Sequence, residues 1–93
     1  KGRPAIPPPG GAWPNPARGE LTIALALPAT GSGGVLELMD LAGRRVAFHE
    51  LSGLSAGRHQ VPLLERRALP PGVYVVRLSR GGETRGMKVA VVQ

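Results

Sequence analysis

The sequence contains no cysteine, so neither a disulfide framework nor a cysteine-ligated zinc site can stabilise this chain. Aromatic residues are nearly absent, with Trp13, Phe48 and Tyr74 the only three. Sheet proteins that bind single-stranded nucleic acid stack bases on exposed aromatic side chains, so a nucleic-acid partner is not expected. No apolar run approaches the roughly 20 residues of a membrane-spanning helix, and we expect no transmembrane segment.

Acidic residues are also few. Only 6 Asp and Glu stand against 12 Lys and Arg, a formal net charge of +6. A basic balance permits acidic partners of several kinds without choosing among them.

The residues needed for catalysis or metal binding are too few and too scattered. His49 and His59 are the only histidines, and Asp40 is the only aspartate. No motif places a serine or a carboxylate to make a triad with either histidine, and two histidines without a third ligand do not make a zinc site. We therefore expect no enzyme activity, no cofactor and no metal.

Proline and glycine, in contrast, are abundant, with 10 and 14 residues. Six of the prolines lie in the first 16 residues, three of them consecutive at 7–9. Consecutive prolines favour polyproline II and remove backbone donors. We expect residues 1–14 to form a Pro/Gly-rich linker and residues 15–93 to form one domain. Because the chain begins at Lys1, we read it as a piece of a larger precursor or a processed form.

Apolar residues beyond the linker alternate with a period of two, which is typical of half-buried strands. The alternation begins at Leu21 and ends at Pro28. The other segments expected to be strands are 35–40, 44–51, 58–63, 72–79 and 84–92. Turn-rich links separate them, and a seventh short strand is expected from either 4–13 or 64–69.

Residues 35–51 also fit a single amphipathic helix, because Leu38, Leu41 and Val46 would share one stripe. We prefer a hairpin, because Asp40-x-x-Gly43 suits a type I turn followed by a glycine in the left-handed region. Gly43 inside a helix would instead cost about 1 kcal/mol.

The strand pattern predicts an all-β fold, an Ig-like or fibronectin-like antiparallel β-sandwich of six to seven strands. The core is expected to take alternate residues of these strands. The expected core residues are Leu21, Ile23, Leu25, Leu36, Leu38, Val46, Phe48, Val61, Tyr74, Val76 and Leu78.

The run from Leu69 through Gly72 to Tyr74 is typical of a tyrosine corner, in which the tyrosine hydroxyl bonds to backbone just upstream. We expect a buried Tyr74 ring whose hydroxyl bonds near residues 69–71. This places 72–79 as the penultimate strand and 84–92 as the last. Asp40, Gly43, Gly72 and Tyr74 are accordingly assigned as structural motif residues.

Several short motifs occur in a characteristic order over roughly residues 15–92. They are Asn15-Pro16, Leu21–Leu27 ending at Pro28, Leu36-x-Leu38-x-Asp40-x-x-Gly43-Arg44-x-Val46, Leu54-Ser-Ala-Gly57-x-His59-x-Val61, Leu69-x-x-Gly72-Val73-Tyr74-x-Val76-x-Leu78 and Lys88-Val89. Taken together, this ordered set resembles the C-terminal sorting domain of the type IX secretion system. It is also similar to the Ig-like domain of the flagellar hook-capping protein.

The resemblance implies a non-catalytic domain that is fused behind a cargo and carried through the periplasm to an outer-membrane translocon. The linker is where such a domain is often cut off. The implied partners are the secretion machinery or neighbouring domains, with anionic lipopolysaccharide as a further partner at the surface. The implied location is secreted or at the cell surface. The alternative is a retained Ig-like binding or assembly module, either a filament subunit or an accessory domain of a hydrolase.

The last hairpin is our candidate for recognition by the secretion machinery. A terminal strand lies at or near a sheet edge, where unpaired backbone groups can accept a partner strand. Clustered cations can steer the hairpin toward an acidic partner. The candidate recognition residues are Arg77, Arg80, Arg85, Lys88, Val89 and Val91.

Overall fold

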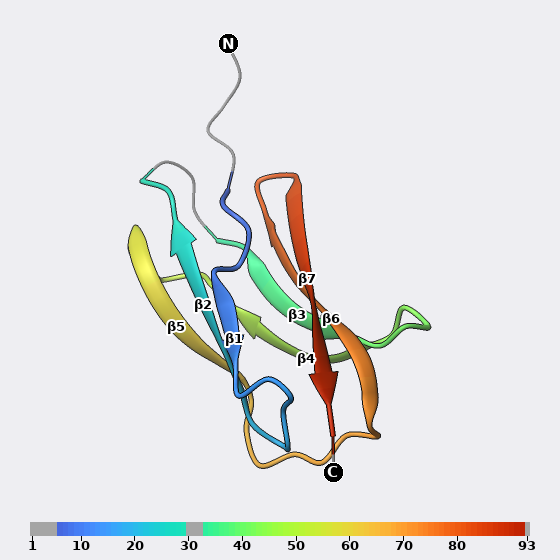
Figure 1. Cartoon of the computed structure of the whole chain (residues 1–93). Coiled ribbons are helices and arrows are strands. Elements are labelled where there is room, and N and C mark those ends of the chain that lie inside the picture. The colour runs from blue at the N-terminus through green and yellow to red at the C-terminus, as the bar shows by residue number, and fades with distance from the viewer. Residues whose placement is uncertain (1–5, 30–32, 93) are drawn as a thin grey trace.

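The structure is a computed structural model that describes residues 6–29 and 33–92. It is all-β, and its strands form two sheets (Figure 1). The strands are β1 (Gly11–Trp13), β2 (Leu21–Leu27), β3 (Val35–Met39), β4 (Arg45–Glu50), β5 (Gly57–Leu64), β6 (Gly72–Arg80) and β7 (Glu83–Val91). The expected antiparallel sandwich is thereby confirmed, and its seventh strand, β1, comes from the 4–13 region.

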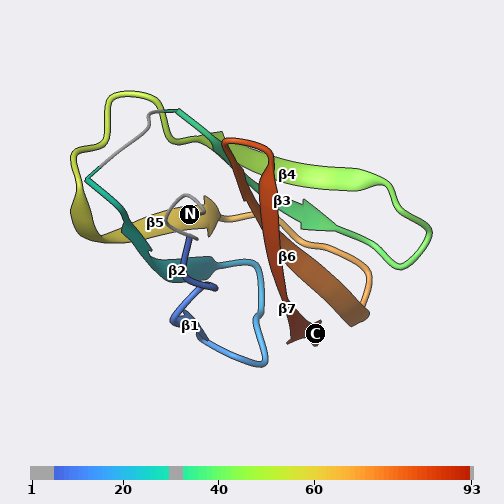
Figure 2. The same ribbon diagram turned by 90° about the horizontal axis from the view of Figure 1, so that it is seen from above.

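The two sheets face each other with the core between them (Figure 2). One sheet has the order β1-β2-β5 and the other β4-β3-β6-β7, and every neighbouring pair is antiparallel. Pro62 lies in β5, an edge strand, as its missing backbone donor requires. The strand alternation fills the core, and the expected residues are buried apart from two on β4.

The prediction that Phe48 is a core residue is wrong, and Val46 packs against the core only in part. Phe48 is 51% exposed, and Val46 is half-buried against the core. Leu38 pairs with Ala47 and Glu37 with Phe48, and the register shifts between Leu38 and Met39. Because Leu38 faces the core, Ala47 shares that face and Phe48 points outward. A one-residue change in register moves a side chain to the opposite face of the sheet.

The hairpin expected over 35–51 is confirmed, and no helix forms there. The Gly43 N–H donates to the Asp40 carbonyl at 3.0 Å, and Gly43 has φ of 88°. This left-handed conformation is one that glycine adopts at little cost.

Part of the segment expected to be a linker packs on the sandwich. Ile6 is only 4% exposed, and the Gly10 N–H donates to the Ala24 carbonyl at 2.8 Å. β1 then pairs with β2 as an edge strand, a position that tolerates the neighbouring prolines. The boundary between linker and domain at residues 14 and 15 stays a prediction, but the packed body includes residues from Ile6 onward.

Candidate recognition surface

β7 is an edge strand of the four-stranded sheet. It pairs with β6 along its whole length, from Arg80 opposite Glu83 to Gly72 opposite Val91. The two-residue turn between them, Gly81-Gly82, has φ of 61° and 84°, the two positive values that a type I′ hairpin turn needs. The expected last hairpin is therefore present. Within its sheet, β7 pairs with β6 along one edge, and its other edge faces away from β6.

The C-terminal end of this edge is covered by the chain between β1 and β2. The Ala17 N–H donates to the Ala90 carbonyl at 2.8 Å, and the Val92 N–H donates to the Ala17 carbonyl at 2.9 Å. The Ala90 N–H in turn donates to the Asn15 side-chain oxygen at 3.2 Å. These bonds show that the backbone groups of Ala90 point away from β6.

Backbone orientation in an antiparallel strand repeats every second residue. Thr84, Gly86 and Lys88 therefore also point their N–H and C=O groups away from β6. The Arg85 guanidinium donates to the Thr84 carbonyl at 3.1 Å. Within residues 6–29 and 33–92, no hydrogen bond joins another residue to the outward groups of Gly86 and Lys88. We call the backbone of these two residues the open edge.

The side chains of three recognition candidates, two of them apolar, are buried in the sandwich. Val89 and Val91 are each 2% exposed, and Arg80 is 8% exposed. Their side chains alternate with outward-facing neighbours along the hairpin, so they cannot contact a partner while β7 is paired. Val89 and Val91 contribute to the candidate surface by holding β7 against the core.

Arg77 is held by a glutamate that the sequence reading had not singled out. Glu37 lies opposite Arg77 on β3, and the Arg77 Nε donates to the Glu37 Oε1 at 3.0 Å. Arg45 approaches the other oxygen at 3.3 Å and lies over the Phe48 ring, 4.3 Å from its centroid. The Arg77 charge is thus partly neutralised, and Lys88 and Arg85 remain as the cations nearest the open edge.

The Asp40 turn has the geometry expected of a structural motif. Asp40 Oδ1 accepts the Ala42 and Arg44 backbone N–H groups at 3.0 and 2.9 Å, and Oδ2 pairs with the Arg44 Nε at 2.9 Å. The backbone hydrogen bond from Arg44 lowers the pKa of Asp40, and the Arg44 side chain lowers it further. This carboxylate is therefore committed to the turn rather than to chemistry.

Both histidines donate to backbone carbonyls. His49 Nδ1 binds the Glu50 oxygen at 2.9 Å, and His59 Nε2 binds the Ser55 oxygen at 2.7 Å. Within the ranges that the structure describes, no group of three or more metal-ligating side chains is found. The same ranges contain no helix of the length and apolar character needed to cross a membrane.

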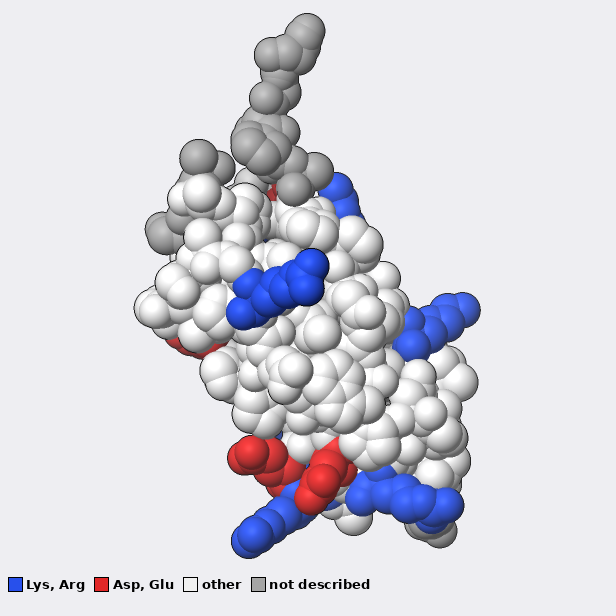
Figure 3. All heavy atoms as spheres, turned by 60° about the vertical axis from the view of Figure 1, so that its left-hand side comes forward, with Lys and Arg blue, Asp and Glu red and all other residues white. Residues whose placement is uncertain are grey.

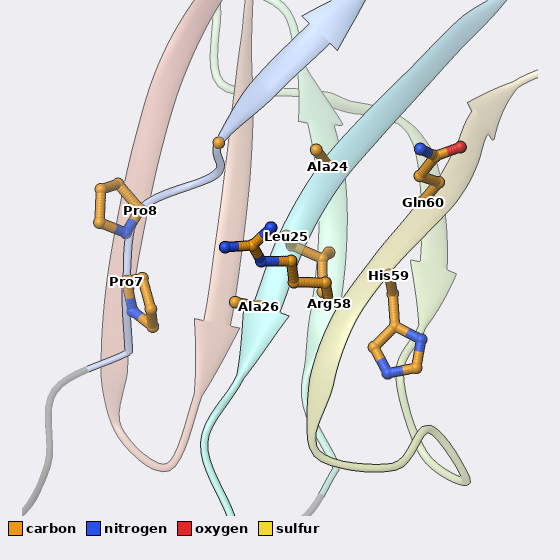
Figure 4. A pocket seen from close by; sticks show the side chains of 9 residues that line it. Pro7, Pro8, Ala24, Leu25, Ala26, Arg58, His59 and Gln60 are labelled. Atoms are coloured by element: carbon orange, nitrogen blue, oxygen red, sulfur yellow. The ribbon is translucent and has the colours of Figure 1, made fainter.

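A shallow groove lies on the outer face of the three-stranded sheet (Figure 4). Pro7 and Pro8 form one wall, Ala24 and Ala26 form the floor, and Arg58 reaches over the floor. The lining side chains are small or uncharged apart from Arg58 and His59. The groove therefore offers no acid–base pair for catalysis.

Charged residues do not form a continuous strip on the side of the molecule that carries β2 and β5. Figure 3 shows this side as mostly uncharged, with separate basic side chains near its middle and at its right edge and with acidic and basic side chains gathered together at its lower end. Proteins that follow a nucleic-acid backbone present a continuous basic groove. This side of the molecule lacks that feature.

The geometry defines the class of protein: an antiparallel β-sandwich in which the Asp40 carboxylate serves a turn and the Glu37 carboxylate joins arginines of neighbouring strands. A family model described as secretion system C-terminal sorting domain matches residues 11–93. No curated protein matches the chain significantly. The chain belongs to the family of secretion system C-terminal sorting domains, which is non-catalytic. It is the C-terminal sorting domain of a type IX secretion system cargo.

Membership of this family has two consequences. The domain interacts with the secretion machinery, and its cargo is secreted or attached to the cell surface. The family match favours the sorting role over the retained assembly module.

Proposed function

We propose that the folded sandwich is itself the export signal, and that the secretion machinery reads the open edge of β7 by adding a strand to it. The observation that carries this proposal is the edge position of β7 with outward backbone groups at Gly86 and Lys88. Strand addition gives affinity through main-chain hydrogen bonds and tolerates varied side chains. A machine that exports many cargoes benefits from such tolerance.

The cations beside the open edge affect how the machinery approaches the domain rather than how its strand pairs with β7. Lys88 is exposed and Arg85 is half-exposed, whereas Arg77 shares Glu37 with Arg45. An acidic surface on the machinery would be drawn to this end of the domain, and the attraction would weaken as salt rises. At the cell surface, anionic lipopolysaccharide presents the same complementary charge.

The family role supports the proposed route, and the packing of Ile6 supports the proposed processing step. The domain and its cargo pass through the periplasm before the outer membrane is crossed. A cut that removes the domain falls on the amino side of Ile6, because Ile6 is 4% exposed and packs in the core. A cut beyond Ile6 would leave a gap in the domain that the machinery has just read.

Gly86→Pro tests the reading of the open edge. The N–H that proline removes points away from β6, and an added Cβ would lie 3.5 Å from the Val76 carbonyl, an ordinary contact. Proline is tolerated at such edge positions but blocks strand addition. A reporter fused in front of Gly86→Pro should accumulate in the periplasm of a host with type IX secretion.

Glu50→Pro is the matched control. Glu50 is exposed on β4, the opposite edge of the same sheet, and the Leu51 N–H donates to the Gly34 carbonyl. The Glu50 N–H therefore points away from β3, as the Gly86 N–H points away from β6. Normal export of Glu50→Pro with blocked export of Gly86→Pro supports the proposal. Equal export of both, with both folded, contradicts it.

A further inference from the structure

Residues Ile6–Gly10, which we call the strap, connect the two sheets before β1 begins. At one end the Ile6 N–H donates to Glu83 Oε1 at 2.8 Å, and Glu83 is the first residue of β7. At the other end the Gly10 N–H donates to the Ala24 carbonyl on β2. The Ile6 side chain, 4% exposed, lies in the core. The backbone nitrogen of Ile6 is therefore held at the start of β7, next to the turn of the last hairpin.

As long as Ala5 precedes Ile6, the Ile6 nitrogen that donates to Glu83 belongs to a neutral amide. Hydrolysis of the Ala5–Ile6 amide by water yields a carboxylate on Ala5 and an amine on Ile6, which takes up a proton near neutral pH. The nitrogen atom that already donates to Glu83 would then be an ammonium group. Hydrogen bonds between ionised partners are shorter and roughly twice as strong as neutral ones.

We propose that Glu83 is the receptor for a new amino terminus at Ile6. A cut at this bond replaces an amide hydrogen bond by an ion pair at the same atom. Cutting therefore tightens the strap on β7 instead of releasing it, and the separated domain is more stable than the fused one. This proposal rests on the processing step proposed above only because that step would produce the cut. The chemistry at Glu83 does not depend on which surface the machinery reads.

The ion pair has a defined pH dependence. Glu83 favours the protonated amine, so the pKa of the Ile6 amine in the folded domain lies above the ordinary value of about 7.7–8.0. The added stability is full below that ordinary value and is lost as the pH rises through the raised pKa. Arg80 lies opposite Glu83 on β6, so its positive charge reduces the rise, but it stays charged throughout. The strap itself carries no titratable side chain.

The test uses the whole chain with the residues before Ile6 replaced by a protease recognition sequence that leaves Ile6 first. The unfolding equilibrium constant is measured on the same preparation before and after cutting. At about pH 6.5 we expect cutting to lower this constant about two- to fivefold, and at about pH 9.5 we expect the difference to vanish. In Glu83→Gln the cut should bring no gain at either pH.

Two further measurements make the test decisive. Acetylating the Ile6 amine of the cut chain restores an amide and should cancel the gain. Titration of the Ile6 amine by NMR in the folded, cut wild-type chain should show a raised pKa, and this reading does not require Glu83→Gln to fold. An amine that titrates at its ordinary value, or a gain that survives in Glu83→Gln, overturns the proposal. Neither result affects the reading of the open edge, which Gly86→Pro tests separately.

Discussion

The hydroxyl of Tyr74 donates to the carbonyl of Pro70, four residues upstream, at 2.7 Å. The ring is 5% exposed and lies in the core between the sheets. This bond ties the loop after β5 to the start of β6, the partner strand of β7. The expected tyrosine corner is thus present, and it supports the hairpin from the end opposite its turn.

Tyr74→Phe should lower the free energy of unfolding by about 1 kcal/mol, because it removes one intramolecular hydrogen bond and keeps the ring. Urea denaturation of the purified domain measures the difference. Val73→Ala, on the exposed face of the same strand, is a control expected to change stability less. If Tyr74→Phe is as stable as the wild type, the hydroxyl bond does not stabilise this corner.

Glu37→Gln should lower the free energy of unfolding by about 1–2 kcal/mol. The Glu37 side chain is 9% exposed and accepts from both Arg77 and Arg45, so the amide leaves two guanidinium groups without their carboxylate. Arg45→Gln should cost less than about 1 kcal/mol, because its side chain is 48% exposed and Arg77 still binds Glu37. Denaturation at low and high salt compares the two variants. A larger loss for Arg45→Gln than for Glu37→Gln would contradict this ranking.

Asp40→Asn should reduce stability near neutral pH and make less difference in acid. The pKa of Asp40 is lowered in the folded chain, so its carboxylate stabilises the fold above the ordinary aspartate pKa. That contribution is lost as the pH falls through the lowered pKa. Thermal unfolding of wild type and Asp40→Asn from about pH 6 to about pH 2 should show the two curves converging. A gap that is constant with pH would mean that the charge of Asp40 contributes nothing.

Lys88→Glu should slow export while leaving the domain folded, because Lys88 is exposed beside the open edge. Arg58→Glu is the matched control, since Arg58 is also exposed but lies on β5 in the other sheet. The rate at which a fused reporter reaches the cell surface separates the two. Equal rates for both variants would show that net charge, rather than charge at this edge, is what matters.

Alternation within each strand was enough to predict most of the fold from the sequence. Leu21, Ile23 and Leu25 needed only their own spacing to be placed in the core. Phe48 was misplaced because its face depends on pairing with Glu37 of β3, which spacing within β4 does not encode. Ile6 was assigned to a linker because prolines follow it, and its burial depends on contacts with both sheets.

The candidate surface was predictable only in outline. The edge position of β7 followed from its place at the end of the last hairpin, and it is confirmed. Which side chains remain accessible did not follow, because Val89 and Val91 face inward and Glu37 on β3 binds Arg77 on the neighbouring strand β6. Contacts between strands far apart in the sequence depend on register, and register is fixed by the assembled sheet.

Hydrogen–deuterium exchange on the domain bound to the purified secretion machinery tests the central claim most directly. Strand addition at the open edge predicts that the Gly86 and Lys88 amides, which face away from β6, become protected from exchange on binding. The outward amides of Phe48 and Glu50 on the opposite edge, β4, should exchange as fast as in the free domain. Unchanged exchange at Gly86 and Lys88 in a complex that forms normally would contradict recognition through this edge.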